Sequence, residues 1–113
     1  MLDTRLVGRD AQALREDTAA IDLPGRQLLG AEQEGWLAEQ MVTSVRSGAT
    51  WNLLGQQVMF APQTAAGARA GNPDSWDGYR ASRTRVFDMI ERAKLGNLAV
   101  LTGDVHSSWA YDL

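Results

Sequence analysis

The chain has 113 residues, a length suited to one domain, and 44% of them are apolar, enough to fill a hydrophobic core. Its formal net charge is −3, and no basic stripe with interleaved aromatics gives a signature of nucleic-acid binding. The absence of cysteine excludes disulfides and thiolate ligands. No apolar stretch approaches the roughly 18 residues of a membrane span, and no signal peptide is recognisable at the N-terminus.

The N-terminal part of the chain carries weak signals. Residues 1–7 are short and mixed and resemble the tail of a strand, which suggests that residues before them are missing. Residues 8–27 hold scattered charges with glycine and proline, so they predict a surface loop with one helical turn near residues 11–16. A loop of this length inside a domain is usually functional or disordered.

The first strongly predicted helix covers residues 28–47. Leu37, Met41 and Val45 recur at intervals of four residues with Trp36 beside them, so one face is apolar. Gly48 supplies the stop signal. This apolar face is interpreted as core rather than as a cofactor site.

A strand is predicted over residues 51–60, ended by Pro62. Its centre reads Gly55-Gln56-Gln57, an unusual choice for a buried strand. Two interpretations remain open: the interruption is a β-bulge, or its polar side chains reach a site.

A small-residue loop over 63–72 leads to a turn rich in aromatics and carboxylates, residues 74–79. Asp77 is either the N-cap of the next helix or, together with Trp76 and Tyr79, part of a rigid polar and aromatic lip over a pocket. The helix that follows is predicted over residues 80–95.

That second helix has an apolar stripe and several arginines. The stripe consists of Val86, Met89, Ile90 and Ala93. The arginines are interpreted as a solvated face rather than as an anion site; they are Arg80, Arg83, Arg85 and Arg92.

Residues 98–102 form an apolar run typical of a strand buried on both faces. Gly103 lets the chain turn, and Asp104 and His106 follow. If the segment stays extended, these side chains project the same way beyond the carboxyl end of a sheet, where α/β folds bind ligands. The alternative makes Asp104 a turn residue and His106 an interior histidine. The order strand, helix, strand, helix, strand predicts an α/β fold.

Three stretches together closely resemble the PhoD-like alkaline phosphatases. They are WNLLGQQVMF at 51–60, DSWDGYRASR at 74–83 and LTGDVHSSW at 101–109. LDTR at 2–5 and LLGAEQ at 28–33 fit the same family in the same order. The resemblance therefore covers nearly the whole chain.

This resemblance implies a calcineurin-like metallophosphoesterase, whose fold is a two-sheet sandwich flanked by helices. It implies hydrolysis of phosphomonoesters and phosphodiesters with calcium and iron, another divalent metal being an alternative, and a parent family that is usually exported. Asp104 and His106 correspond to the superfamily's Gly-His-x-His motif and are the expected catalytic and metal-binding residues. Gln57 falls near a superfamily metal-binding histidine. The active-site loop implies Trp76, Asp77 and Tyr79 as substrate-pocket residues, although Arg80 stands where the family has proline.

The first metal-binding aspartate and histidine of the family, its bridging carboxylate and its Gly-Asn-His/Asp ligands have no counterpart in this sequence. We therefore expect residues 1–113 to be the C-terminal portion of a single metallophosphatase domain, incomplete at both ends and weakly active or inactive without the upstream half. The alternative is a non-catalytic module that retains part of the scaffold and binds an anion or a partner through the loops after Phe60 and Gly103. An unrelated α/β domain would require three accidental motif matches.

Overall fold

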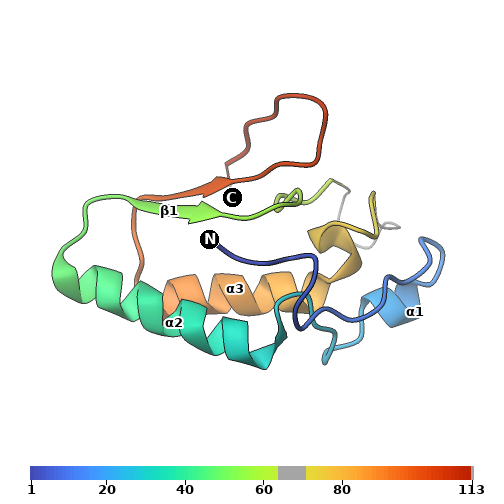
Figure 1. The fold of residues 1–113 in the computed structure, drawn as a ribbon, viewed down its shortest axis with the longest axis horizontal. Helices are drawn as coiled ribbons and strands as arrows, with labels where there is room; N and C mark the ends of the chain where they lie inside the picture. The colour runs from blue at the N-terminus through green and yellow to red at the C-terminus, as the bar shows by residue number, and fades with distance from the viewer. Residues whose placement is uncertain (64–70, 113) are drawn as a thin grey trace.

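Two short parallel strands lie over a pair of long helices (Figure 1). The computed structural model describes residues 1–63 and 71–112. Within them, the chain forms α1 (Thr18–Ile21), α2 (Gly30–Ser47), β1 (Asn52–Gly55), the 3-10 helix η1 (Trp76–Gly78), α3 (Arg80–Ala93) and β2 (Leu98–Leu101). None of these described helices has the length and apolar character needed to cross a membrane.

The two strands pair in parallel, with Asn52 opposite Leu98 and Gly55 opposite Leu101. Parallel strands need a crossover, and η1 and α3 lie in the connection between β1 and β2. The mixed helix and strand architecture confirms the predicted α/β class. Residues 1–7 do not form a strand; their backbone bond to β1 runs from Leu2 N to Gly55 O, 2.9 Å, and one such bond does not make a ladder.

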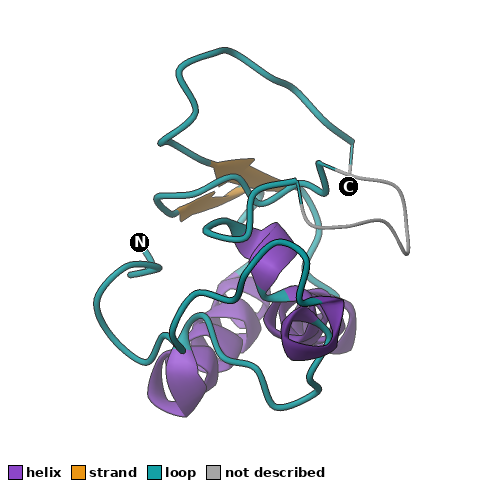
Figure 2. Cartoon of the chain, turned by 90° about the vertical axis from the view of Figure 1, so that its right-hand side faces the viewer, coloured by secondary structure: helices purple, strands orange, loops and turns teal. Residues whose placement is uncertain are grey.

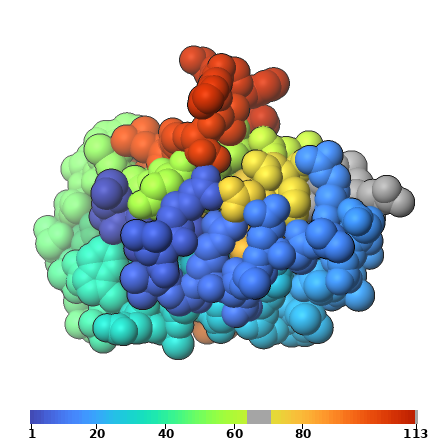
Figure 3. Space-filling view, turned by 45° about the vertical axis from the view of Figure 1, so that its right-hand side comes forward, coloured from blue at the N-terminus to red at the C-terminus, as the bar shows by residue number. Residues whose placement is uncertain are grey.

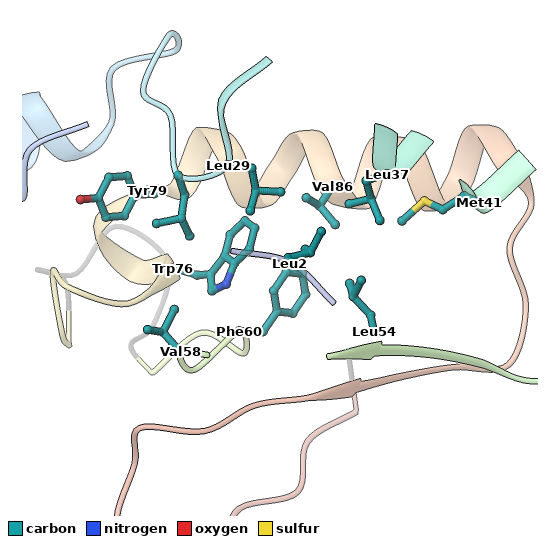
Figure 4. Packing of buried hydrophobic residues seen from close by; sticks show 11 residues of the cluster. Leu2, Leu29, Leu37, Met41, Leu54, Val58, Phe60, Trp76, Tyr79 and Val86 are labelled. Atoms are coloured by element: carbon teal, nitrogen blue, oxygen red, sulfur yellow. The ribbon is translucent and has the colours of Figure 1, made fainter. Parts of the chain in front are cut away.

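The hydrophobic core fills the space between the sheet and the helices (Figure 4). It draws on α2, β1, η1, α3 and the start of the N-terminal segment, which runs between the sheet and the helices in Figure 1. The buried cluster consists of Leu2, Leu28, Leu29, Leu37, Met41, Leu54, Val58, Phe60, Trp76, Tyr79 and Val86. Met89, Ile90 and Ala93, the remainder of the predicted α3 stripe, are partly buried against it.

Strand β2 is not buried on both faces, so that prediction is wrong. Its residues are half-buried or exposed, and Leu101 is 58% exposed. On β1, Leu53 is 71% exposed whereas Leu54 is buried. Figure 2 shows the reason: the helices lie on one side of the sheet, and on the other side the C-terminal loop arches away from it. The apolar run satisfied the pattern of a buried strand, but only one face is covered by described residues.

Several predicted boundaries shift because of tertiary contacts. Helix α2 begins at Gly30 rather than at residue 28, since the chain crosses itself there: a Cβ on Gly8 would lie 2.5 Å from Leu29 O. The N-terminal helical turn is α1, several residues later than predicted, and Asp17 caps it by accepting from Ala20 N. Strand β1 ends at Gly55, so the Gly-Gln-Gln interruption is where the strand stops.

The arginines of α3 were interpreted as a solvated face, and for Arg83 and Arg85 this is wrong. Arg85 forms a salt bridge to the buried Glu34 on α2, with Nε 2.9 Å from Oε2. Arg83 pairs with Asp77, whose side chain is only 1% exposed. Buried carboxylates require such partners, and helix packing places the arginines over them.

Candidate functional site

The carboxyl ends of both strands meet the N-terminal segment. Just after β1, the Gln57 side-chain oxygen accepts from Thr4 N at 2.8 Å and from Thr4 Oγ1 at 2.6 Å. Just after β2, Asp104 pairs with Arg5, with Oδ2 2.9 Å from Nη2. Gly103 N donates to Gln57 O at 3.1 Å and joins the two strand exits. Polar groups from three segments therefore meet at the sheet edge where α/β folds place their ligands.

The chain turns sharply at the Asp-x-His motif instead of staying extended. Asp104 has φ +70°, in the left-handed region, and Val105 N donates to Gly103 O at 2.8 Å. The condition under which Asp104 and His106 would project the same way is therefore not met. His106 is exposed and, within the described residues, has no hydrogen-bond or ion-pair partner, so it is not an interior histidine.

An ionic cluster adjoins this edge, which we call the Arg5 cluster: Arg5, Arg9, Asp74 and Asp104. Arg5 donates through Nη1 to Asp74 Oδ2 and through Nη2 to Asp104 Oδ2, so it bridges two carboxylates. Arg9 donates to the second oxygen of Asp74 and to Thr4 O, the latter at 2.9 Å. Asp74 therefore links both arginines of the N-terminal segment to the turn before η1.

Electrostatics keep the Arg5–Asp74 pair ionised. Burial alone would raise the pKa of the Asp74 carboxyl, but hydrogen bonding and charge from Arg5 and Arg9 outweigh it and hold that pKa below its ordinary value. The hydrogen bond to Asp74 is the main reason that the pKa of Arg5 is raised. The pKa of Asp3 is also lowered, chiefly by the backbone N–H of Arg5 and then of Leu6.

Trp76, Asp77 and Tyr79 lie in the interior rather than at the rim of a cleft. Trp76 is 0% exposed, forms an edge-to-face contact with Phe60 and donates from Nε1 to Gln56 Oε1 at 3.0 Å. The buried Tyr79 donates its hydroxyl proton to the Asp10 carbonyl at 2.9 Å. In Figure 4 the Trp76 ring points into the core and the Tyr79 hydroxyl points away from it.

Asp77 is the centre of a second polar group, which we call the Asp77 clasp. Its Oδ1 accepts from Arg83 Nη1 at 2.8 Å, and its Oδ2 accepts from the backbone N–H groups of Gln63, at 3.1 Å, and Gly71, at 3.3 Å. Asp77 does not cap α3, because the N-cap is Tyr79, and its own N–H is capped by Ser75.

Two clefts flank the C-terminal segment, which projects above the rest of the molecule in Figure 3. The smaller one, about 250 Å³, is lined by Gly103, Val105 and Ser107 among others, so it borders the Asp-x-His motif. The larger one, about 510 Å³, runs along β2 and is lined by Phe60, Val100, Trp109, Tyr111 and neighbours. Trp109 lines both.

The family model described as PhoD-like phosphatase matches residues 1–113 of this chain. The chain belongs to the PhoD-like phosphatase family. It is 47% identical over 92 residues to alkaline phosphatase D of Bacillus subtilis strain 168, and those residues are 80% of this chain and 15% of the relative. A solved structure described as "Structure of PhoD" matches with a TM-score of 0.83 and 43% identity, over 96% of this chain and 21% of the other.

These matches confirm the family and the metallophosphatase-type fold that the resemblance implied. The PhoD-like chain spans much less than half the length of either relative. The core and the strand exits described above therefore correspond to a minor part of the length of those relatives.

The described residues of this PhoD-like chain do not by themselves fit a metal centre. No group of three or more His, Asp or Glu side chains converges within residues 1–63 and 71–112. The Asp104 carboxylate forms a salt bridge with Arg5. Within the described part of the chain, His106 has no hydrogen-bond or ion-pair partner. A zinc-type or calcium-type site needs more ligands than these two residues provide.

No sequence pattern indicates the two carboxylate partners of Arg5. Arg5 and Asp74 are 69 positions apart, so no spacing rule connects them. The LDTR motif at 2–5 was noted only for its resemblance. The one usable signal was that an arginine in this motif and an aspartate in DSWDGY both belong to stretches shared with PhoD-like phosphatases.

Proposed function

We propose that this chain contributes to the active site of a phosphoric ester hydrolase that acts on phosphomonoesters or phosphodiesters. The supporting observation is the meeting of Gln57, Arg5 and Asp104 at the carboxyl ends of β1 and β2, beside the 250 Å³ cleft. This is the position at which α/β folds bind ligands. Family membership supports the reaction class, and the position of Gln57, Arg5 and Asp104 at the carboxyl ends of the strands is the reason for choosing these residues.

Metal dependence, with calcium and iron as the resemblance implies, is part of this proposal. Since the described residues lack a sufficient ligand set, a cation would need further ligands from elsewhere, and we propose that the upstream part of the parent domain supplies them. Asp104 and His106 are the residues of this chain that would join that set. No catalytic step through a cation follows from these two residues alone.

The residues of this chain have definable tasks in such a site. Arg5 holds the carboxylate of Asp104 in one orientation at the strand exit. Gln57 presents its amide there, with the oxygen engaged by Thr4. His106, exposed beside the cleft-lining Val105 and Ser107, carries an imidazole that can bind a ligand or transfer a proton. Trp76, Asp77 and Tyr79 would act on a substrate pocket by fixing the shape of the turn rather than by contact.

A chimera tests this proposal. The chain replaces the corresponding segment of Bacillus subtilis alkaline phosphatase D, and hydrolysis of p-nitrophenyl phosphate and its bis ester is followed with calcium and iron supplied. We expect turnover by the chimera, weak or no turnover by the isolated chain, and a loss of about 100-fold or more in kcat/KM for Asp104→Asn and His106→Ala.

The matched control is Arg46→Ala, which removes an exposed arginine in the last turn of α2. It should leave kcat/KM unchanged. A folded chimera, verified by circular dichroism, that is inactive would contradict the proposal. So would Asp104→Asn and His106→Ala variants that retain the unmodified rate.

The alternative, a non-catalytic binding module, is favoured by one observation: the 510 Å³ cleft beside β2 contains exposed aromatics, Trp109 at 63% and Tyr111 at 45%. Exposed aromatic surface is typical of interaction sites. Turnover by the chimera that depends on Asp104 and His106 would exclude this alternative.

A further inference from the structure

We infer that Arg5 is the residue of this chain that binds a phosphoryl oxygen, and that Asp74 is a positioning residue that aims it. This assignment rests on the proposed function and adds to it an anion-binding group that neither Asp104 nor His106 supplies. The observations behind it are the geometry of the Arg5 cluster and the different exposure of its two arginines.

Arg9 is committed to the protein interior. It is 11% exposed, and its guanidinium donates to Thr4 O and to both the carboxylate and the backbone oxygen of Asp74. Its guanidinium carbon lies 4.9 Å from the centre of the Tyr79 ring, so an aromatic face covers one side of the group. Arg9 is therefore an anchor for Asp74 and is not available to a ligand.

Arg5 has the opposite character. Its side chain is 32% exposed, and two of its nitrogens each serve one carboxylate oxygen, of Asp74 and of Asp104. A guanidinium carries five N–H donors, so this arrangement leaves donors to spare. Asp104, one of the two partners, is itself 44% exposed and stands on a turn rather than in a strand. Asp74 is held at its other oxygen by Arg9, whereas Asp104 is the more exposed of the two partners of Arg5.

This geometry matches the requirements of phosphate recognition. A guanidinium held from one side presents its remaining donors in a fixed fork, which suits the tetrahedral oxygens of a phosphoryl group. Fixing it in advance removes the cost of ordering a long side chain when the ligand arrives. The location at the carboxyl ends of β1 and β2, next to Gln57, is the one expected for a ligand.

The same geometry makes Asp104 a competitor for Arg5. In the absence of a ligand, the Asp104 carboxylate occupies a position on Arg5 that an incoming anion would take, since both are oxygen acceptors of the same donors. Removal of that charge should therefore strengthen anion binding to the chain. A purely structural role for Arg5 predicts no such gain.

The test measures binding of inorganic phosphate to the 113-residue chain by NMR chemical-shift titration. EDTA excludes cations, and chloride keeps the ionic strength constant. We expect saturable shifts at the amides of residues 4–6 and 103–105. Compared with the unmodified chain, affinity should rise about fivefold in Asp104→Asn, fall several-fold in Arg5→Lys and fall tenfold or more in Arg5→Ala. Arg46→Ala is the matched control and should bind as the unmodified chain does.

Two variants, Asp74→Asn and Arg5→Lys, test the positioning of the Arg5 guanidinium separately from any effect on folding. Asp74→Asn should weaken phosphate binding several-fold, because the guanidinium of Arg5 is no longer held. Arg5→Lys keeps a positive charge at this position, so its loss of affinity would report the fork geometry rather than the net charge. Thermal unfolding of each variant shows whether the fold is retained.

Equal phosphate affinity in the unmodified chain and in Arg5→Ala would overturn the assignment. So would weaker binding by Asp104→Asn, or the absence of saturable binding by that variant. In the chimera, Arg5→Ala with an unchanged KM and full turnover would remove Arg5 from the site while leaving the proposed function intact. Activity that survives Asp104→Asn and His106→Ala would instead remove the proposed function.

Discussion

Asp74 and Asp77 lie three positions apart in the sequence, but they belong to two arginine–aspartate groups with opposite environments. In the Asp77 clasp, the carboxylate is 1% exposed, and Arg83 with two backbone N–H groups satisfies both of its oxygens. In the Arg5 cluster, Asp74 is 32% exposed and Asp104 is 44% exposed. In the Asp77 clasp the carboxylate is buried with both oxygens paired. In the Arg5 cluster both carboxylates are partly exposed to solvent.

Exposure therefore distinguishes a carboxylate that stabilises the fold from one that can interact with a ligand, although both residues are aspartates. A fully paired buried carboxylate stabilises its surroundings only while every partner is present, because an unpaired buried charge is costly. A half-exposed cluster contributes little to stability, but its groups can exchange partners with a ligand. The motif DSWDGY therefore contains one aspartate that is buried and fully paired and one that belongs to the partly exposed Arg5 cluster.

The largest expected effect comes from breaking the turn over residues 73–78, which contains both aspartates. In Gly78→Ala, the new Cβ would lie 1.9 Å from the Pro73 carbonyl oxygen, which is backbone and has no rotamer to move into. We expect a loss of more than about 4 kcal/mol in the free energy of unfolding, or failure to fold, measured by urea denaturation.

The matched control is Gly35→Ala, in the middle of α2, where a Cβ would meet nothing within 4 Å. This substitution should stabilise the chain by about 0.5–1 kcal/mol because alanine is the better helix former. A small cost for Gly78→Ala would mean that residues 73 and 78 are not in close contact.

The next effect distinguishes the two aspartates directly. Asp77→Asn leaves the Arg83 guanidinium, 11% exposed, without its carboxylate, and should cost about 3 kcal/mol. Asp74→Asn should cost about 1 kcal/mol or less, because the Asp74 carboxylate is itself 32% exposed and the more buried of its partners, Arg9, still donates to Thr4 O. Urea denaturation of both variants at neutral pH measures the contrast. Equal losses would show that the environments of the two groups do not differ as described.

The smallest effect is a pH dependence. The pKa of Asp74 is lower in the folded chain than in the unfolded chain, so its contribution to stability is present above the unfolded pKa and is lost as pH falls through the folded pKa. As pH falls from 6 through the ordinary aspartate range and below it, the unmodified chain should therefore lose more stability than Asp74→Asn, and their unfolding free energies should converge. Curves that stay parallel over this range would contradict the assigned ion pair.

The sequence predicted the elements whose signals are local. The apolar stripe of α3 and the glycine stop of α2 gave the helices within a few residues, because periodicity and capping act over one or two turns. The motifs at 51–60, 74–83 and 101–109 indicated the family, which the comparisons confirm. The predicted roles of Asp104 and His106 stay predictions, and the predicted loop over 63–72 lies mostly outside the described residues.

What the tertiary structure alone decided is which polar side chains meet. The partners of Arg5 are 69 and 99 positions away, and nothing in local propensity or spacing specifies a contact across such distances. The sequence likewise could not show whether one or both faces of β2 are covered, because an apolar run has the same pattern in both cases. The sequence by itself thus determined the family and the helices, because these depend on neighbours in the chain. The pairing of charges at the strand exits depended on neighbours in space.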